Sequence, residues 1–232
     1  MASIQTQTPA RPAGGRIAAV REMAALQRLL FEVEREFLRT VTALIPRLGD
    51  IELKYLLCQH VWESAGHARF LKERGGELNG FGKGEGARPA IRRVFEEALR
   101  ANSAEAALAG FYQILKPALL EAYQSYLRLT HHLADWPSRH LVEAFLEDEE
   151  RHAAEIAPFL ERISAPEWTA HLQQVLQAMG GWLGQDPIES LPEAFTWQAD
   201  AAAYTHPDTC SRGDFPVCSS VFSEDPKETP IV

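Results

Sequence analysis

Two stretches of the chain place charged side chains where a helix would bury its apolar face. In the first stretch His60, Glu63 and His67 recur at three- and four-residue intervals, so all three would point the same way on one helix. In the second stretch Glu149 and His152 interrupt a similar apolar stripe as a Glu-x-x-His pair. Burying an unpaired carboxylate is costly, so such groups must pair with one another or bind a metal. Carboxylates and imidazoles that converge inside a helical bundle are the ligands of a two-metal site.

The surrounding apolar residues define both stripes. They are Leu53, Leu56, Leu57, Phe70 and Leu71 in the first helix, and Leu141, Val142, Phe145, Ile156, Phe159 and Leu160 in the second. A simpler interpretation is also open for the second helix, because Glu149 belongs to the acidic run 147–150, which could be a solvated face beside a hydrogen-bonded core histidine. Two stripes interrupted in the same way favour the metal site over that alternative.

Two further carboxylates would complete such a site. Glu34 lies nearest the apolar stripe among the glutamates of a helix expected at 17–44. Glu121 lies about 115° from the stripe of a helix expected at 102–134, so ideal helical geometry does not bring it inside. Pro117, one turn earlier, or a π-bulge would rotate the register and turn Glu121 inward. Glu34 and Glu121 are therefore the candidate third and fourth carboxylates.

This arrangement resembles the ferritin-like di-iron carboxylate superfamily, in which four helices supply Glu, Glu-x-x-His, Glu and Glu-x-x-His in that order. The resemblance covers about residues 17–163, and only Glu149-Glu-Arg-His152 matches the motif outright. The spacing from Glu63 to His67 is one residue longer, so His60, His67 or both are expected as ligands. The resemblance implies that four glutamates take part in catalysis, namely Glu34, Glu63, Glu121 and Glu149. The implied metal ligands are these four together with His60, His67 and His152.

The same resemblance implies a non-haem oxygenase or oxidase. Its cofactor would be two iron ions, with manganese or a mixed manganese and iron centre as alternatives, and dioxygen would be the co-substrate. A small organic substrate would undergo hydroxylation, N-oxygenation or desaturation, with electrons from a separate donor. Two other functions stay open: a ferritin-like protein that oxidises or binds iron without an organic substrate, and a metal-free helical interaction module. A homodimer is one option for the assembly.

The periodicity predicts an all-α fold with an additional C-terminal helix and an irregular tail. The resemblance implies that its main helices form a ferritin-like four-helix bundle with a long crossover. Besides the helices at 17–44 and 102–134, we expect helices at 50–75, with Asp50 as its N-cap, and at 89–100, 136–163 and 166–180. The chain then divides into a flexible N-terminal arm (1–16), the bundle (17–183) and an irregular C-terminal extension (184–232). That extension is Pro-rich and could close over the site as a lid or wrap the surface.

Composition narrows the function classes. The chain has 232 residues and a net charge of −9 with scattered Lys and Arg, so a nucleic-acid partner is not favoured. No apolar run is long enough for a membrane span and no secretory leader is evident, so we expect a cytoplasmic protein without a membrane partner. Of the three cysteines, Cys210 and Cys218 flank a short polar loop that could form a disulfide or hold a metal, but two free thiols fit a reducing cytosol better.

Overall fold

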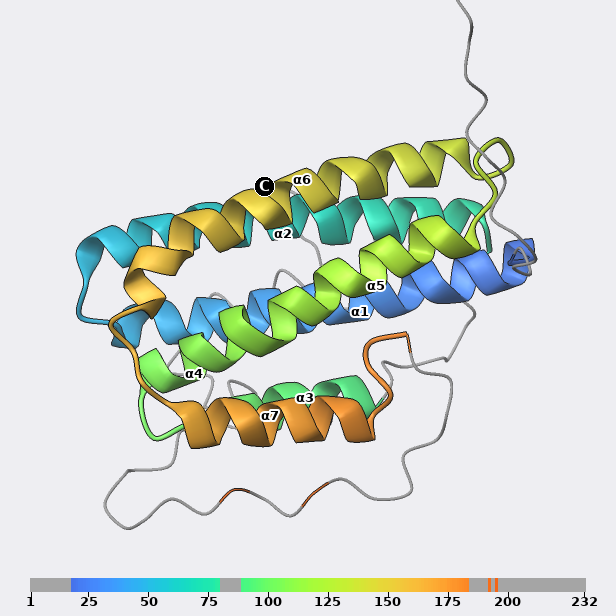
Figure 1. The fold of residues 1–232 in the computed structure, drawn as a ribbon. Coiled ribbons are helices and arrows are strands. Elements are labelled where there is room, and N and C mark those ends of the chain that lie inside the picture. The colour runs from blue at the N-terminus through green and yellow to red at the C-terminus, as the bar shows by residue number, and fades with distance from the viewer. Residues whose placement is uncertain (1–17, 80–88, 184–191, 193–194, 196–232) are drawn as a thin grey trace, which may run out of the picture.

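A computed structural model describes residues 18–79, 89–183, 192 and 195, and no strand occurs among them. The expected all-α fold is therefore confirmed for this part of the chain. In chain order the elements are α1 (Val20–Leu44), the 3-10 turn η1 (Ile45–Arg47), α2 (Ile51–Glu77), α3 (Pro89–Ala98), α4 (Ala104–Gly110), the π-helical segment η2 (Phe111–Leu115), α5 (Lys116–Leu129), α6 (Trp136–Leu160) and α7 (Pro166–Ala178) (Figure 1).

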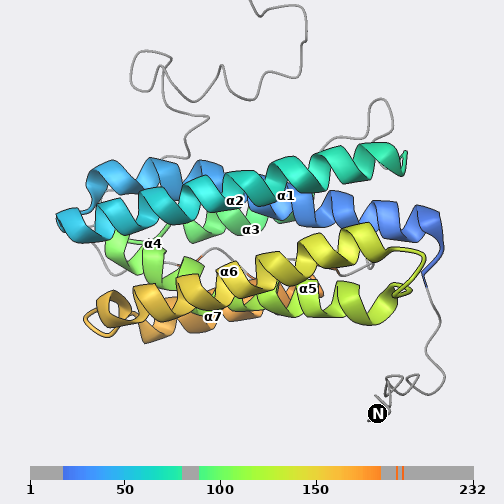
Figure 2. The ribbon, with the colours of Figure 1, turned by 90° about the horizontal axis from the view of Figure 1, so that it is seen from above.

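Four long helices enclose a common core. Helix α1 packs against α2 and α5, and α6 packs against the same two helices, so each of the four contacts two others (Figures 1 and 2). Helices α3 and α7 lie side by side and form an outer layer, in contact with α1 and α4 respectively (Figure 1). The interior between the four long helices is therefore shielded on the side that this outer layer covers.

The turn between α1 and α2 shows how the chain specifies its first helical pair. The Asp50 side chain accepts hydrogen bonds from the backbone N–H groups of Glu52 (2.9 Å) and Leu53 (3.1 Å), which confirms it as the N-cap of α2. Only η1 and a few residues separate the two helices, so they run antiparallel and pack along their length (Figure 2). The predicted pairing of the first two helices is correct.

The third long helix is built from α4, η2 and α5, and it ends at Leu129 rather than near Ala134. Ser103 caps its start by accepting a hydrogen bond from the Ala106 N–H (3.0 Å). A Cβ at Gly110 would clash with the Leu172 side chain, so only glycine permits this close approach of α4 and α7. The π-helical turns of η2 begin directly after this contact and come before Pro117.

A buried polar network joins the long helices near one end of the bundle. Asp135 is fully buried and accepts hydrogen bonds from the hydroxyl groups of Tyr126 (2.6 Å) and Ser138 (2.5 Å). Tyr126 in turn accepts a hydrogen bond from Gln27 (2.7 Å), and Arg74 donates one to Ser138 (2.9 Å). Because these residues belong to α1, α2, α5 and α6 or precede α6 directly, the network ties all four helices together.

Several expectations fall on residues outside the described ranges. They concern the N-terminal arm, most of the crossover between α2 and α3, nearly all of the C-terminal extension, and both Cys210 and Cys218. Within the described ranges Cys58 is a free, exposed thiol. None of the helices there is both long enough and apolar enough to cross a membrane.

Candidate metal centre

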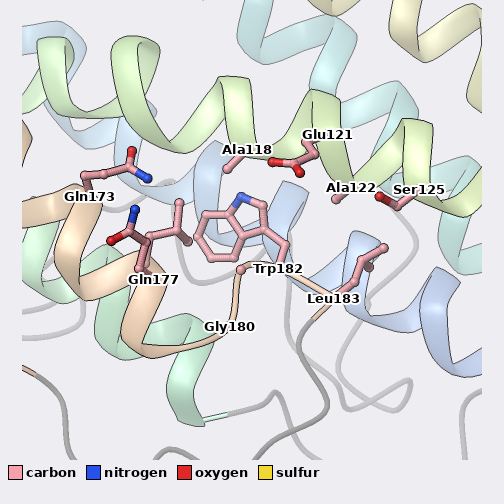
Figure 3. Close-up of a pocket in the computed structure, with 11 residues that line it drawn as sticks. Ala118, Glu121, Ala122, Ser125, Gln173, Gln177, Gly180, Trp182 and Leu183 are labelled. Carbon is pink, nitrogen blue, oxygen red and sulfur yellow. The ribbon is translucent and has the colours of Figure 1, made fainter.

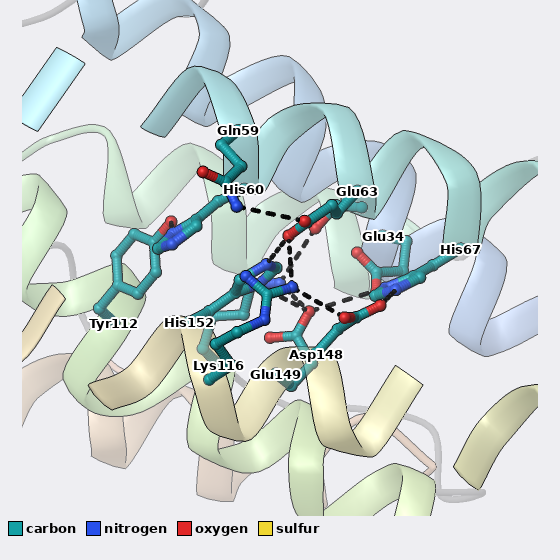
Figure 4. A network of polar contacts seen from close by, with 12 residues as sticks. Glu34, Gln59, His60, Glu63, His67, Tyr112, Lys116, Asp148, Glu149 and His152 are labelled. Carbon is teal, nitrogen blue, oxygen red and sulfur yellow. Dashed lines mark hydrogen bonds and ion pairs between the residues drawn. The ribbon is translucent and has the colours of Figure 1, made fainter. Parts of the chain in front are cut away.

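Three buried side chains from three different helices converge in the core of the bundle. Glu34 of α1, His67 of α2 and Glu149 of α6 each offer one donor atom, and these atoms all lie within 4.8 Å of one another (Figure 4). The three residues are between 0% and 3% exposed. Two carboxylates and an imidazole at this separation can surround a metal ion, and we call them the metal triad.

Glu34 is the member of its helix that reaches the core site. Its Oε1 accepts hydrogen bonds from the Tyr123 hydroxyl (2.6 Å) and from His67 Nδ1 (3.3 Å), whereas its Oε2 has no hydrogen-bond partner. The neighbouring Glu32 and Glu36 are also buried, but they pair with arginines of α1. The sequence-based choice of Glu34 among these glutamates thus agrees with where the structure places it.

His67 is held between acidic groups on both sides of its ring. Its Nδ1 lies 3.3 Å from Glu34 Oε1 and 3.8 Å from Glu149 Oε1, and its Nε2 lies 3.1 Å from Asp148 Oδ2. Burial alone would lower the pKa of His67, but the hydrogen bond and charge of Glu34 outweigh that effect and raise it. The triad therefore attracts positive charge, either a proton or a metal ion.

Glu63 and His152 form a second group beside the triad. His152 Nε2 lies 2.5 Å from Glu63 Oε2, and Arg151 donates to the same oxygen at 2.9 Å. Burial works against ionisation of Glu63, yet the bonds from His152 and Arg151 lower its pKa to about 2, so it is a carboxylate at neutral pH. His152 Nδ1 has no hydrogen-bond partner and lies 3.7 Å from Glu149 Oε1. Glu149 thus lies between His67 and His152 and can bridge the two groups.

His60 supports this second group rather than joining the triad. Its ring stacks on the His152 ring with the centroids 4.0 Å apart. Burial, reinforced by the nearby His152, lowers the pKa of His60 to about 4, so the ring is neutral at pH 7. Its two nitrogens contact the Tyr112 hydroxyl (2.9 Å) and Glu155 Oε2 (3.2 Å), which fits Nδ1 as acceptor and Nε2–H as donor. Of the two histidines left open by the spacing, His67 is the one in the triad.

A lysine that was not among the residues predicted for the site lies within the cluster. The Lys116 ammonium forms an ion pair with Glu149 Oε1, donates to Ser64 Oγ (3.2 Å) and lies 4.0 Å from the centre of the Phe37 ring. The side chain is 4% exposed. Burial disfavours a charged Glu149, but Lys116 and His152 hold the pKa of its carboxyl well below the usual range. The spacing from Tyr112 and Leu119 does put Lys116 on the apolar stripe, which was the available signal.

The expectation for Glu121 was wrong. Its side chain is exposed and lines a surface pocket of about 420 Å³ beside Gln177 and Trp182 (Figure 3), and no residue of the triad lines that pocket. The π-helical segment η2 lies in this helix before Pro117, but the residues after it that reach the core site are Lys116 and Tyr123 rather than Glu121. The described part of this helix therefore supplies a cation and a phenol where a fourth carboxylate was expected.

The unsatisfied atoms of the cluster fit a bound metal. Three buried atoms there have no hydrogen-bond partner, namely Glu34 Oε2, Glu149 Oε2 and His152 Nδ1. All three are buried away from bulk water, and buried polar atoms are normally satisfied. A mixture of carboxylate oxygens and imidazole nitrogens without thiolates suits iron or manganese better than softer metals.

Comparisons with known proteins add no identification. No protein-family model matches the chain, and no match was found among curated proteins or solved structures. The interpretation of the site therefore depends on the geometry described above.

Proposed function

We propose that this protein is a non-haem, metal-dependent oxygenase or oxidase of the ferritin-like type, with its primary metal site at the triad of Glu34, His67 and Glu149. Iron is the preferred metal, with manganese as the alternative, and dioxygen is the co-substrate. A small organic molecule is oxidised, and a separate donor supplies electrons. The cytoplasm fits this chemistry as the site of action, since it provides reductant and keeps thiols reduced.

The observation that carries the proposal is the buried triad with its unsatisfied oxygen atoms. Two carboxylates from α1 and α6 meet within 4.8 Å of a histidine from α2, and one oxygen of each carboxylate has no hydrogen-bond partner. A divalent cation held by these residues would balance the buried negative charge and would offer a partner to carboxylate oxygens that have none. Helices that each contribute inward carboxylates or histidines are the pattern of di-metal carboxylate bundles.

The ferritin-like arrangement gives a natural place for a second ion. Glu63 and His152 would hold it, with Glu149 between the two positions, and His60 would keep the His152 ring in place by stacking. The departure from the family pattern lies on the third long helix, where Lys116 and Tyr123 face the cluster in place of a glutamate.

When bound, iron(II) supplies the electrons that reduce dioxygen, and the protein's part is to hold the metal, orient its ligands and limit access. Burial and the charges of Glu34 and Glu149 raise the pKa values of Tyr112 and Tyr123 well above the usual range, so both phenols stay protonated. Tyr123 therefore donates to Glu34 at all physiological pH values and fixes which oxygen of that carboxylate stays free. Arg151 covers the more exposed edge of the site at Glu63.

One observation favours a metal-free function instead. Lys116 neutralises part of the buried negative charge, and each acidic residue of the cluster has at least one polar partner in the protein. A helical interaction module with a self-paired core would show these contacts as well. It would not explain the two buried carboxylate oxygens that have no hydrogen-bond partner.

The test is to load the full chain with iron(II) under anaerobic conditions and then admit dioxygen in the presence of a reductant. The proposal predicts retained iron, a change in absorbance that depends on oxygen, and oxygen uptake over many cycles of re-reduction at constant iron content. Uptake that stops after one oxidation of the iron, with oxide accumulating, would favour an iron-oxidising protein. A chain that retains no iron would favour the metal-free module.

Replacing Tyr123 with Phe is expected to weaken metal binding by about 10- to 100-fold, because hydrogen bonds to a ligating carboxylate orient it and tune its affinity. Titration of the apo-protein with iron(II) or manganese(II) measures the affinity. Tyr126→Phe is the matched control, since Tyr126 lies one turn along α5 and bonds to Gln27 and Asp135, not to the triad. Equal metal affinity in Tyr123→Phe and Tyr126→Phe would contradict a ligand role for Glu34.

A further inference from the structure

Lys116 lies where a bridging metal ion would be expected. Its ammonium contacts Oε1 of Glu149, and that same oxygen lies 3.8 Å from His67 Nδ1 and 3.7 Å from His152 Nδ1. The oxygen is therefore the point shared by the triad and the second group. An ion held jointly by both groups through this oxygen would compete with the Lys116 nitrogen, which already binds it (Figure 4).

The lysine is built into this place rather than resting there by chance. Ser64 accepts a second hydrogen bond from the ammonium at 3.2 Å, and the Phe37 ring provides a favourable face for the cation at 4.0 Å. All three partners are well buried, and they come from three different helices, α1, α2 and α6. Displacing the amine would break an ion pair, a hydrogen bond and a cation–π contact together.

The charges of the cluster also favour a single divalent ion. Glu34, Glu63 and Glu149 contribute three negative charges, and Lys116 contributes one positive charge, which leaves a net charge of −2. One divalent metal ion balances this charge, whereas two would leave an excess of positive charge in a buried site. Arg151 pairs with Glu63 and also with Asp148 and Glu155 at the more exposed edge, and these last two carboxylates more than offset its positive charge, so the cluster stays net negative.

From this geometry, and given the metal centre proposed above, we propose that Lys116 takes the second metal position. The native centre then binds one divalent ion, at Glu34, His67 and Glu149, and Lys116 acts as the permanent second cation. Removing the amine frees Glu149 Oε1 and opens a second metal position at Glu63 and His152. Lys116 is thus a residue that determines metal stoichiometry.

The experiment compares metal stoichiometry in the wild type and in Lys116→Met, which keeps an unbranched apolar stem but removes the terminal amine and its charge. Each full chain is loaded anaerobically with iron(II), freed of excess metal by gel filtration and analysed for iron. Wild type is expected to retain one iron per chain and Lys116→Met two, as in two-metal sites. Lys72→Met is the matched control, because Lys72 is an exposed lysine on α2, and it should retain one iron.

Two iron ions per wild-type chain, or no gain of iron in Lys116→Met, would overturn this inference while leaving the oxygenase proposal intact. A wild type that binds no iron would overturn the proposed function and this inference with it.

Circular dichroism and thermal unfolding show whether Lys116→Met folds. If it does not fold, Lys116→Gln provides the same comparison, because glutamine is neutral but retains a hydrogen-bond donor for Ser64. The wild-type stoichiometry by itself still decides whether the native centre binds one metal ion.

Discussion

Replacing Glu149 with Ala is expected to abolish metal retention and to lower the free energy of unfolding of the metal-free protein by about 3–5 kcal/mol. Metal retention is lost because Glu149 belongs to the triad and lies between the two groups of ligands. Stability falls because the Lys116 ammonium would stay buried with only Ser64 and the Phe37 ring as partners. The amine would then have to lose its proton or draw water into the core.

Both effects can be measured on the same samples. Urea unfolding of the apo-protein gives the change in free energy, and elemental analysis after iron(II) loading gives metal retention. Glu150→Ala is the matched control, since Glu150 is the next residue of α6 and its side chain is exposed. A Glu149→Ala variant that retains as much iron as Glu150→Ala would remove Glu149 from the centre, whatever its stability.

Replacing Asp135 with Ala is expected to cost about 3 kcal/mol of stability while leaving metal stoichiometry unchanged. The substitution removes the acceptor for the hydroxyls of Tyr126 and Ser138, and a buried donor without a partner typically costs about 1–3 kcal/mol. The hydrogen-bond network around Asp135 includes Gln27 of α1, which lies seven residues before Glu34. That separation corresponds to about 10 Å of helix. At that distance the two sites should act independently.

Urea unfolding and iron analysis of Asp135→Ala, with the exposed Glu143→Ala of α6 as control, test this separation. Loss of stability without loss of iron would show that the four-helix network holds the bundle and the triad holds the metal. A loss of iron per folded molecule, beyond the loss of folded protein itself, would mean that the Asp135 network and the triad are coupled and that the two sites are not independent.

Much of the fold and the core of the candidate site could be predicted from sequence. His67, Glu149 and His152 were found because they interrupt apolar stripes, where a polar group must be paired or bound. Helix ends marked by local signals, such as Asp50 at the start of α2, were also predicted correctly. These features depend on residues close together in the chain, so helical periodicity and local capping signals are enough to predict them.

The third long helix was the difficult part, since the presence of a π-bulge and its effect on Glu121 depend on tertiary contacts. The π-helical segment η2 follows Gly110, where the side chains of Leu172 and Trp168 approach α4 closely. The local sequence pattern does not predict that contact, because Leu172 and Trp168 lie far away in the chain. Glu121 stays at the surface, where ideal helical geometry places it, and Lys116 is buried on the apolar stripe. Lysine is almost never fully buried unless paired, so a sequence pattern gives little reason to place one in a core.

Anomalous diffraction at the iron absorption edge, from crystals of the full chain loaded with iron(II), is the most direct test of the metal centre. We predict one strong peak among Glu34, His67 and Glu149, with no comparable peak between Glu63 and His152 while Lys116 is present. Loaded crystals that show no peak at the triad would contradict the account, and the unsatisfied carboxylate oxygens would then need another explanation.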